Sequence, residues 1–187
     1  QTWSYTPNSD AFGADSFTLK FVDAAGSERL ATTNIVVNNI PDYPTGDNKT
    51  LNIFEDMPYT FSSEDFGFSD VDGDQLKAVI IESLPDRGSL VLNDAQVTVN
   101  QVIMTLDLAS LNFIPEGNVN GGSYSSFNFK VQDDNNIATD NFDTSVVVNT
   151  ININVASVND QPSTILEGTI PPIDEDSAND SAIALWL

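Results

Sequence analysis

The sequence predicts an all-β protein, built as tandem repeats of a Greek-key β-sandwich. Two observations carry this prediction. Short runs rich in β-branched and aromatic residues alternate with Gly, Pro, Asn and Asp, and the landmarks of the chain recur along it in the same order. Hydrophobic residues make up 40% of the chain, which is enough for a domain core of ordinary size.

Eight strand-like runs lie between residues 45 and 162. In order they cover residues 50–54, 59–62, 76–82, 89–92, 96–99, 111–114, 125–132 and 146–155. In the seventh run, Phe127, Phe129 and Val131 share one face and Lys130 points to the other, as in a strand that covers a core. Eight short runs in a segment of about 118 residues are typical of a β-sandwich.

The landmarks repeat at offsets of 108 to 120 residues. The matching pairs are residues 3–7 with 111–115, 17–23 with 127–133, 40–44 with 158–162, and 55–56 with 175–176. The offset grows by eight between the second and third pairs, which fits an insertion at residues 135–145. We therefore expect residues 1–44 to hold the last three strands of one repeat, residues 45–162 a complete repeat, and residues 163–187 the N-terminal strands of the next.

The two partial repeats carry apolar faces that a complete sandwich would bury. Phe17, Leu19 and Phe21 alternate in the first, and residues 182–187 of the second are largely apolar. Because open strand edges and apolar faces favour association, we expect strand complementation between partial repeats of neighbouring chains. Tandem arrays are typical of stalks and binding proteins, whereas enzymes seldom need end-to-end copies of one module.

The chain is strongly acidic, since 28 acids against 6 bases give a net charge of -22. Such a surface repels phosphate backbones and anionic bilayers, so neither nucleic acid nor membrane insertion is expected. Without cysteine or histidine, zinc, haem and thiol sites lose their usual ligands, as do Ser-His and Cys-His catalytic arrangements. Asp outnumbers Glu by 21 to 7, and short carboxylates on loops suit calcium. Solubility alone is the alternative explanation for most of these acids.

Four acids are expected to converge at one end of the sandwich. Asp70 and Asp72 lie in the loop between the second and third runs, and Asp133 and Asp134 follow the seventh run. In a Greek-key sandwich these two loops fall at the same end. Two carboxylates at about 5 Å repel by roughly 3 kcal/mol at an effective dielectric constant near 20, so binding a divalent ion is the cheaper state. The alternative is a turn in which the Asp side chains cap backbone amides and Gly73 supplies a positive φ.

The Asp-x-Asp-Gly-Asp spacing of residues 70–74 also resembles the start of an EF-hand loop. The bidentate Glu of that loop would fall on Ile81, and the segment leads into a strand. We therefore reject an EF-hand.

Four motifs carry a resemblance to a known family. They are Val-Asn-Asp-Gln-Pro at 158–162, Glu-Asp at 55–56, the acidic segment 68–76, and Phe-Ile-Pro-Glu-Gly-Asn at 113–118. Together they resemble the bacterial cadherin-like tandem repeats of large RTX-type and VCBS-type surface adhesins. The resemblance spans all three segments of the chain and implies a cadherin-like sandwich whose repeat junctions bind calcium.

The resemblance also implies ligands for two junctions. The first would use Asp42 from the linker with Asp70, Asp72 and Asp133 or Asp134, joined by Asp10 or Asn8 from the preceding repeat. The second would use Glu55, Asn159 and Asp160, with Glu116 or Asn118 as further candidates. The family's linker pattern Asp-x-Asn-Asp-Asn is incomplete here: Ser157 replaces its first Asp, Gln161 its last Asn, and Pro41 the Asn of the first linker. The number of calcium ions per junction therefore stays open.

We expect an extracellular adhesion or stalk segment of an exported bacterial cell-surface protein, without enzymatic activity, in which calcium rigidifies the junctions between neighbouring repeats. A cell-surface protein or polysaccharide is the expected target. The alternative is a carbohydrate-binding β-sandwich module of a polysaccharide-active protein. Exposed coplanar aromatic rings would favour that alternative, and the candidates are Trp3, Tyr5, Tyr43, Tyr59 and Tyr124. Trp3 and Tyr5 alternate in an expected strand, which favours a core position for both.

Overall fold

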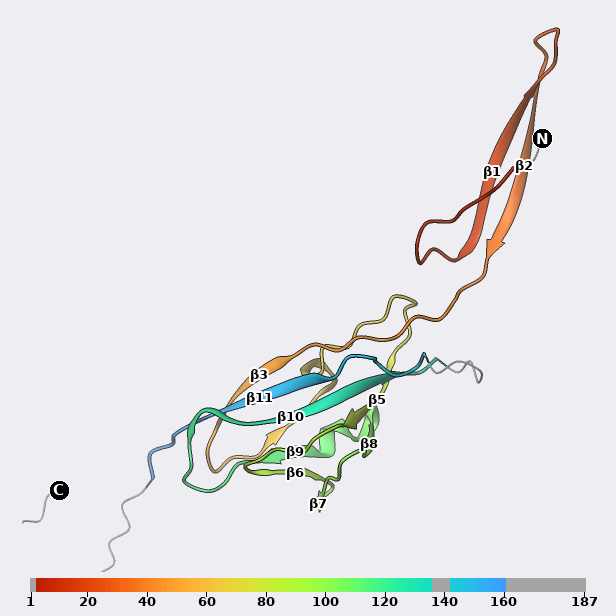
Figure 1. Cartoon of the computed structure of the whole chain (residues 1–187). Helices are drawn as coiled ribbons and strands as arrows, with labels where there is room; N and C mark the ends of the chain where they lie inside the picture. The colour runs from red at the N-terminus through yellow and green to blue at the C-terminus, as the bar shows by residue number, and fades with distance from the viewer. Residues whose placement is uncertain (1–2, 136–141, 161–187) are drawn as a thin grey trace, which may run out of the picture.

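The computed structural model describes residues 3–135 and 142–160, where the architecture is all-β with several sheets in a sandwich-like arrangement (Figure 1). This confirms the predicted class. Residues 163–187, expected to begin the next repeat, lie outside the described residues.

The central sandwich, residues 45–160, has a five-stranded and a four-stranded sheet. In spatial order the larger sheet consists of β3 (Lys49–Phe54), β11 (Asn149–Ala156), β10 (Gly121–Asp133), β5 (Leu76–Ile81) and β8 (Val102–Met104). The smaller sheet consists of β4 (Tyr59–Thr60), β9 (Leu111–Ile114), β6 (Ser89–Leu92) and β7 (Ala95–Gln96). Two short 3₁₀ helices, η1 (Ser63–Asp65) and η2 (Thr105–Ser110), connect the sheets. Strands β3 and β11 are parallel, and the other neighbours pair antiparallel.

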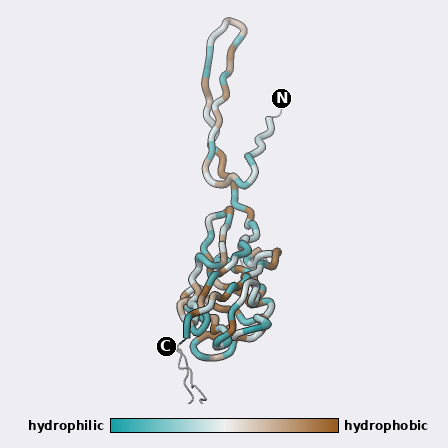
Figure 2. The backbone as a smooth tube through the Cα atoms, turned by 90° about the vertical axis from the view of Figure 1, so that its left-hand side faces the viewer, coloured by the Kyte–Doolittle hydropathy of each residue, from teal (hydrophilic) through white to brown (hydrophobic). Residues whose placement is uncertain are grey.

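The core lies between the two sheets because alternate residues of each strand turn inward. On β10, Phe127, Phe129 and Val131 are fully buried, as their spacing of two predicts. The ring of Phe127 meets Phe61 edge to face at 5.7 Å between centroids, and Phe129 meets Phe66 at 5.0 Å. Figure 2 shows hydrophobic stretches of the tube gathered inside the sandwich. The buried Phe66 thus holds the η1–β5 loop to the core.

The linker that enters the sandwich is bound to it along its length. Pro41 and Pro44 are buried, and Thr45 exchanges two backbone hydrogen bonds with Ser69, at 2.8 and 2.9 Å. The Asp47 amide donates to the Phe66 carbonyl at 3.1 Å. This close approach requires Gly67, whose φ is +57° and where a Cβ atom would lie 2.5 Å from the Asp47 side chain. The linker is therefore held by backbone contacts that need no ion.

Residues 13–37 form a hairpin of β1 (Gly13–Val22) and β2 (Glu28–Val37), which extends away from one end of the sandwich, while β11 leads out at the other (Figure 1). Its pairing repeats that of β10 with β11. Phe17 lies opposite Thr33 and Phe127 opposite Ile151, which are the partners that the sequence offsets of 110 and 118 predict. This agreement supports the view that the hairpin is the end of a preceding repeat, which stays a prediction.

Three expectations about the strands need correction. Strand β7 ends at Gln96 rather than continuing to residue 99, and β8 was not predicted. Residues 3–7 are not a strand, so the segment expected to be the first partial repeat has two described strands rather than the predicted three. Trp3 and Tyr5 are accordingly exposed, at 68% and 41%. The matching β9 is a strand because β4 and β6 pair with it, and residues 3–7 have no such partners among the described strands.

Candidate metal centres

Strands β5 and β10 are antiparallel neighbours, and they bring together the acids predicted to converge. These acids lie at the end of the sandwich that the linker enters. The loop of residues 69–75 leads into β5, and Asp133 ends β10, where it lies opposite Leu76. The carboxylate groups of Asp70, Asp72 and Asp74 each offer an oxygen within 4.8 Å of the others. We call these three residues and Asp133 the upper cluster.

The loop folds around the Asp70 side chain, whose Oδ1 accepts the amides of Asp72 at 2.8 Å and Asp74 at 3.3 Å. Gly73 completes the turn with a φ of +87°, as the sequence predicts for this position. Asx turns of this kind occur without any ion, so the turn alone does not indicate a metal site.

The observation that does point to a ligand is a set of buried oxygens without hydrogen-bond partners. Within the described part of the chain these include Asp70 Oδ2, Asp72 Oδ1 and Asp133 Oδ2. Asp133 is fully buried, and its other oxygen accepts the Asn135 amide at 2.9 Å. Buried polar atoms in native proteins are nearly always satisfied, and an unsatisfied carboxylate oxygen is costly. Three of them in one acidic cluster form an arrangement that a cation could satisfy.

The electrostatics of the upper cluster point the same way. Burial raises the pKa of Asp133 to about 6, and the charges of Asp70 and Asp74 act in the same direction. Burial also raises the pKa of Asp74, followed by the charges of Asp70, Asp134 and Asp72. These carboxylates destabilise one another when ionised, and a divalent cation would remove that repulsion.

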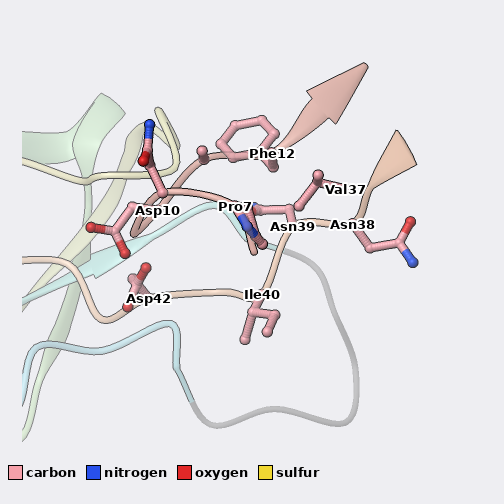
Figure 3. A pocket seen from close by; sticks show the side chains of 10 residues that line it. Pro7, Asp10, Phe12, Val37, Asn38, Asn39, Ile40 and Asp42 are labelled. Carbon is pink, nitrogen blue, oxygen red and sulfur yellow. The ribbon is translucent and has the colours of Figure 1, made fainter. Parts of the chain in front are cut away.

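The linker adds Asp42 to this end of the sandwich. Its amide donates to Asp72 Oδ2 at 2.8 Å, which leaves Asp72 Oδ1 as the oxygen without a partner. Burial raises the pKa of Asp42, and next in order the charges of Asp10, Asp72 and Asp70 raise it further. Figure 3 shows the Asp10 and Asp42 side chains at one side of a hollow between the segment before β1 and the linker, with a volume of about 330 Å³. The linker therefore brings Asp42 next to the upper cluster, and the preceding segment brings Asp10 close enough to Asp42 to raise its pKa.

Asp134 plays a different part from Asp133. It is exposed, and it exchanges hydrogen bonds with the backbone of Gln75: its Oδ1 accepts the Gln75 amide at 2.8 Å, and its own amide donates to the Gln75 carbonyl at 2.9 Å. Of the two alternatives left open, Asp133 is the better candidate ligand and Asp134 fastens the acidic loop to β10.

A second acidic group lies at the opposite end of the sandwich, where the chain leaves β11. Glu55, Asp56 and Asp160 each offer an oxygen within 4.8 Å of the others. The buried Glu55 already accepts the Val158 amide at 2.8 Å and the Asn120 side-chain amide at 3.2 Å. This lower cluster therefore has the predicted Glu55 and Asp160. Both carboxylate oxygens of Glu55 have hydrogen-bond partners. The buried Glu55 therefore does not show the unpartnered oxygens found in the upper cluster.

The remaining candidates of the second junction are placed less favourably. Asn159 is exposed, the Glu116 amide donates to the hydroxyl of Tyr124 at 2.9 Å, and the Asn118 amide donates to Asp56 at 3.1 Å.

Sequence reasoning missed two acids as candidate ligands, Asp74 and Asp56. Both lie beside predicted ligands in the sequence, Asp74 two residues after Asp72 and Asp56 next to Glu55. This closeness in sequence could have identified them as candidate ligands.

All donors of the upper cluster are carboxylate oxygens, the hard ligands that calcium prefers. Calcium takes six to eight oxygens, of which Asp70, Asp72 and Asp74 offer one each within 4.8 Å of one another; Asp133 and Asp42 lie outside this group of three.

No family model matches this chain, and no curated protein matches it. In the described part of the chain, no helix has the length and apolar character needed to cross a membrane.

Proposed function

We propose that this chain is a calcium-binding adhesion or stalk segment of a large, exported bacterial surface protein, similar to cadherin-like repeats. Calcium bound at the upper cluster would join the linker and the preceding repeat to the central sandwich and so stiffen the junction. The role is structural and involves no catalysis. Neighbouring repeats of the same chain are its immediate partners, and a surface protein or polysaccharide is the proposed target.

One observation carries this proposal: three buried carboxylate oxygens without partners lie where the linker enters the sandwich. Solubility does not require acids in such positions, because a carboxylate serves solubility only when water reaches it. Two other parts of the molecule lie next to the upper cluster: the amide of Asp42, in the linker, donates to Asp72, and the charge of Asp10, in the segment before β1, raises the pKa of Asp42. An ion at this place therefore restrains the junction as well as the loop.

The carbohydrate-binding alternative has weaker support. Tyr124 is buried and Tyr59 is half-buried, with its hydroxyl donating to Asp65 at 3.0 Å, so neither ring is an open platform. Trp3 and Tyr5 are exposed and line a hollow with Phe17 and Leu19. The residues that match Trp3 and Tyr5 in the central sandwich, Leu111 and Phe113, are fully buried. Apolar side chains at residues 3 and 5 are therefore accounted for as positions that a complete sandwich would place in its core.

The test is calcium titration of this chain by calorimetry, followed by small-angle scattering of a chain with two complete repeats, with and without calcium. We expect wild type to bind calcium and to extend when it does. Asp72→Ala should weaken binding by about a hundredfold, since losing a charged ligand commonly costs a few kcal/mol. Asp107→Asn, at an exposed acid of η2 outside both clusters, is the matched control and should behave as wild type.

Two outcomes would contradict the proposal. The first is no heat of calcium binding at millimolar concentration, the range typical of extracellular modules. The second is a two-repeat particle that is as extended in wild type without calcium, and in Asp72→Ala, as it is in wild type with calcium. That second result would mean that the linker is stiff by packing alone, even if the ion binds.

A further inference from the structure

The central sandwich has a short segment that the preceding hairpin lacks. In the hairpin, the pairing of β1 with β2 continues without a break to the turn, where Val22 lies opposite Glu28. In the sandwich, β10 pairs with β11 only as far as Phe129 opposite Asn149. Residues 142–145, at the end of the expected insertion, replace β11 as the partner of the last residues of β10. We call residues 142–145 the strap.

Backbone hydrogen bonds fix the strap to the end of β10 that carries Asp133. The Asp133 amide donates to the Asp143 carbonyl at 2.9 Å, and the Ser145 amide donates to the Val131 carbonyl at 2.9 Å. Gln132 forms an isolated bridge with Thr144. Ser145 is buried, and its hydroxyl accepts the Val131 amide at 3.2 Å, which satisfies a group that β11 no longer reaches. The strap therefore sets the position of the buried Asp133.

The strap also touches the linker. The ring of Phe142 packs against that of Tyr43, with 4.6 Å between centroids and 47° between planes. Tyr43 directly follows Asp42, whose amide donates to Asp72. One short segment thus contacts both the strand end that bears Asp133 and the linker residue next to Asp42.

The acid within the strap is placed as a support and not as a ligand. Asp143 Oδ2 accepts the Gln132 side-chain amide at 2.8 Å, and its Oδ1 accepts the Thr144 hydroxyl at 3.0 Å. The unsatisfied oxygens belong instead to Asp70, Asp72 and Asp133. A carboxylate with both oxygens occupied by neighbours holds its surroundings in place.

We propose that the strap is a positioning segment for the cation site, which fixes Asp133 and the linker in the binding arrangement before the ion arrives. This inference rests on the proposed function. Because a preordered site does not spend binding energy on ordering its ligands, the strap raises calcium affinity without contacting the ion. Phe142 and Tyr43 act through Asp42 and are positioning residues. The junction before the central repeat is therefore stiffened both by the ion and by an aromatic contact that needs none.

The test compares calcium affinity, measured by calorimetry, with the order of the linker in EDTA, measured by amide hydrogen exchange at Asp42 and Thr45. Phe142→Ala and Tyr43→Ala should each weaken calcium binding by about three- to tenfold, the range expected for one aromatic pair. Both should also speed exchange at the two linker amides. The double variant should be no weaker than either single one, because the two rings form one contact.

Tyr43→Phe is the matched control, since it keeps the ring, and should bind and exchange like wild type. A purely structural role would lower the melting temperature in EDTA without changing affinity, and that result would overturn the inference. If wild type binds calcium and both alanine variants bind equally well, this inference fails and the proposed function stands. If wild type binds no calcium, the proposed function fails and this inference fails with it.

Discussion

Replacing Asp133 by Asn should stabilise the calcium-free protein and remove most of its response to calcium. Asp133 is fully buried, one of its oxygens lacks a partner, and burial raises its pKa to about 6 from an ordinary 3.8. At pH 7.5 the folded protein must hold this group ionised beside Asp70 and Asp74. Asn has the same shape without the charge, so D133N removes the cost of burying an ionised group and, with it, the repulsion from Asp70 and Asp74.

The size of the effect follows from the pKa. A rise from 3.8 to about 6 corresponds to roughly 3 kcal/mol of unfavourable free energy for the ionised form. Asp70, Asp72 and Asp74 are only half-buried, so solvent screening reduces this to about 1 to 2 kcal/mol. In a domain of this size, that gain raises the melting temperature by about 5 °C.

Calcium should offset this difference in stability, because it stabilises wild type and not D133N. If wild type binds with a Kd of about 0.1 to 1 mM, 10 mM calcium stabilises it by roughly 1.4 to 2.7 kcal/mol through mass action. D133N, which lacks a charged ligand, should gain almost nothing. Thermal melting followed by circular dichroism, in EDTA and in 10 mM calcium, measures both quantities.

Asp134→Asn is the control for this experiment, because Asp134 is the adjacent acid but is exposed and bonded to Gln75. It should keep the calcium response. A lower melting temperature of D133N in EDTA would refute the reasoning, since it would mean that the ionised carboxylate is favourable in the ion-free fold. An undiminished calcium response of D133N would exclude Asp133 as a ligand.

Three further outcomes are expected. Because the pKa of Asp133 is raised in the folded state, its contribution to stability is present below about pH 4 and is lost as pH rises through about 6. The EDTA melting difference between D133N and wild type should therefore vanish near pH 4 and be largest above pH 7. Lys49→Met should destabilise the sandwich by about 1 to 3 kcal/mol with or without calcium, as judged by urea unfolding, because it removes the charged partner of the buried Asp65 at 2.7 Å. Finally, we propose that the hairpin's apolar face makes the chain associate with increasing concentration; a strict monomer by light scattering, with both ends resistant to protease, would contradict this.

The convergence of the acids could be predicted because it depends on topology alone. Once the loop before β5 and the end of β10 are assigned to the same end of a sandwich, Asp70, Asp72 and Asp133 must come close. The choice between Asp133 and Asp134 was also present in the sequence. Asp133 continues the alternation of Phe127, Phe129 and Val131 toward the core, and Asp134 does not.

Other features depend on long-range contacts that no local pattern encodes. Strand β8, Val102 to Met104, has three residues, which are too few to show the alternation of buried and exposed side chains that identifies a strand. It also comes shortly after Asn100, which has a positive φ. The strap was visible only as an inserted segment, because its contact with Tyr43 joins residues about a hundred positions apart. Residues 3–7 match β9 in pattern but lack the pairing partners that make β9 a strand.

The contacts of the linker locate the part of the junction that an ion would stiffen. From Pro41 to Asp47 the chain is already held by buried prolines, by the Thr45–Ser69 pairing and by the Phe142–Tyr43 contact. The segment between β2 and Pro41, residues 38–40, is exposed and outside any strand, so the freedom of the junction is concentrated there. Asp10 and Asp42 lie on either side of this segment, and the charge of Asp10 raises the pKa of Asp42 after the effect of burial. Without a cation, their repulsion would favour opening of the junction at residues 38–40. Under the proposed function, a calcium ion near these two carboxylates would replace that repulsion by attraction and hold the junction closed.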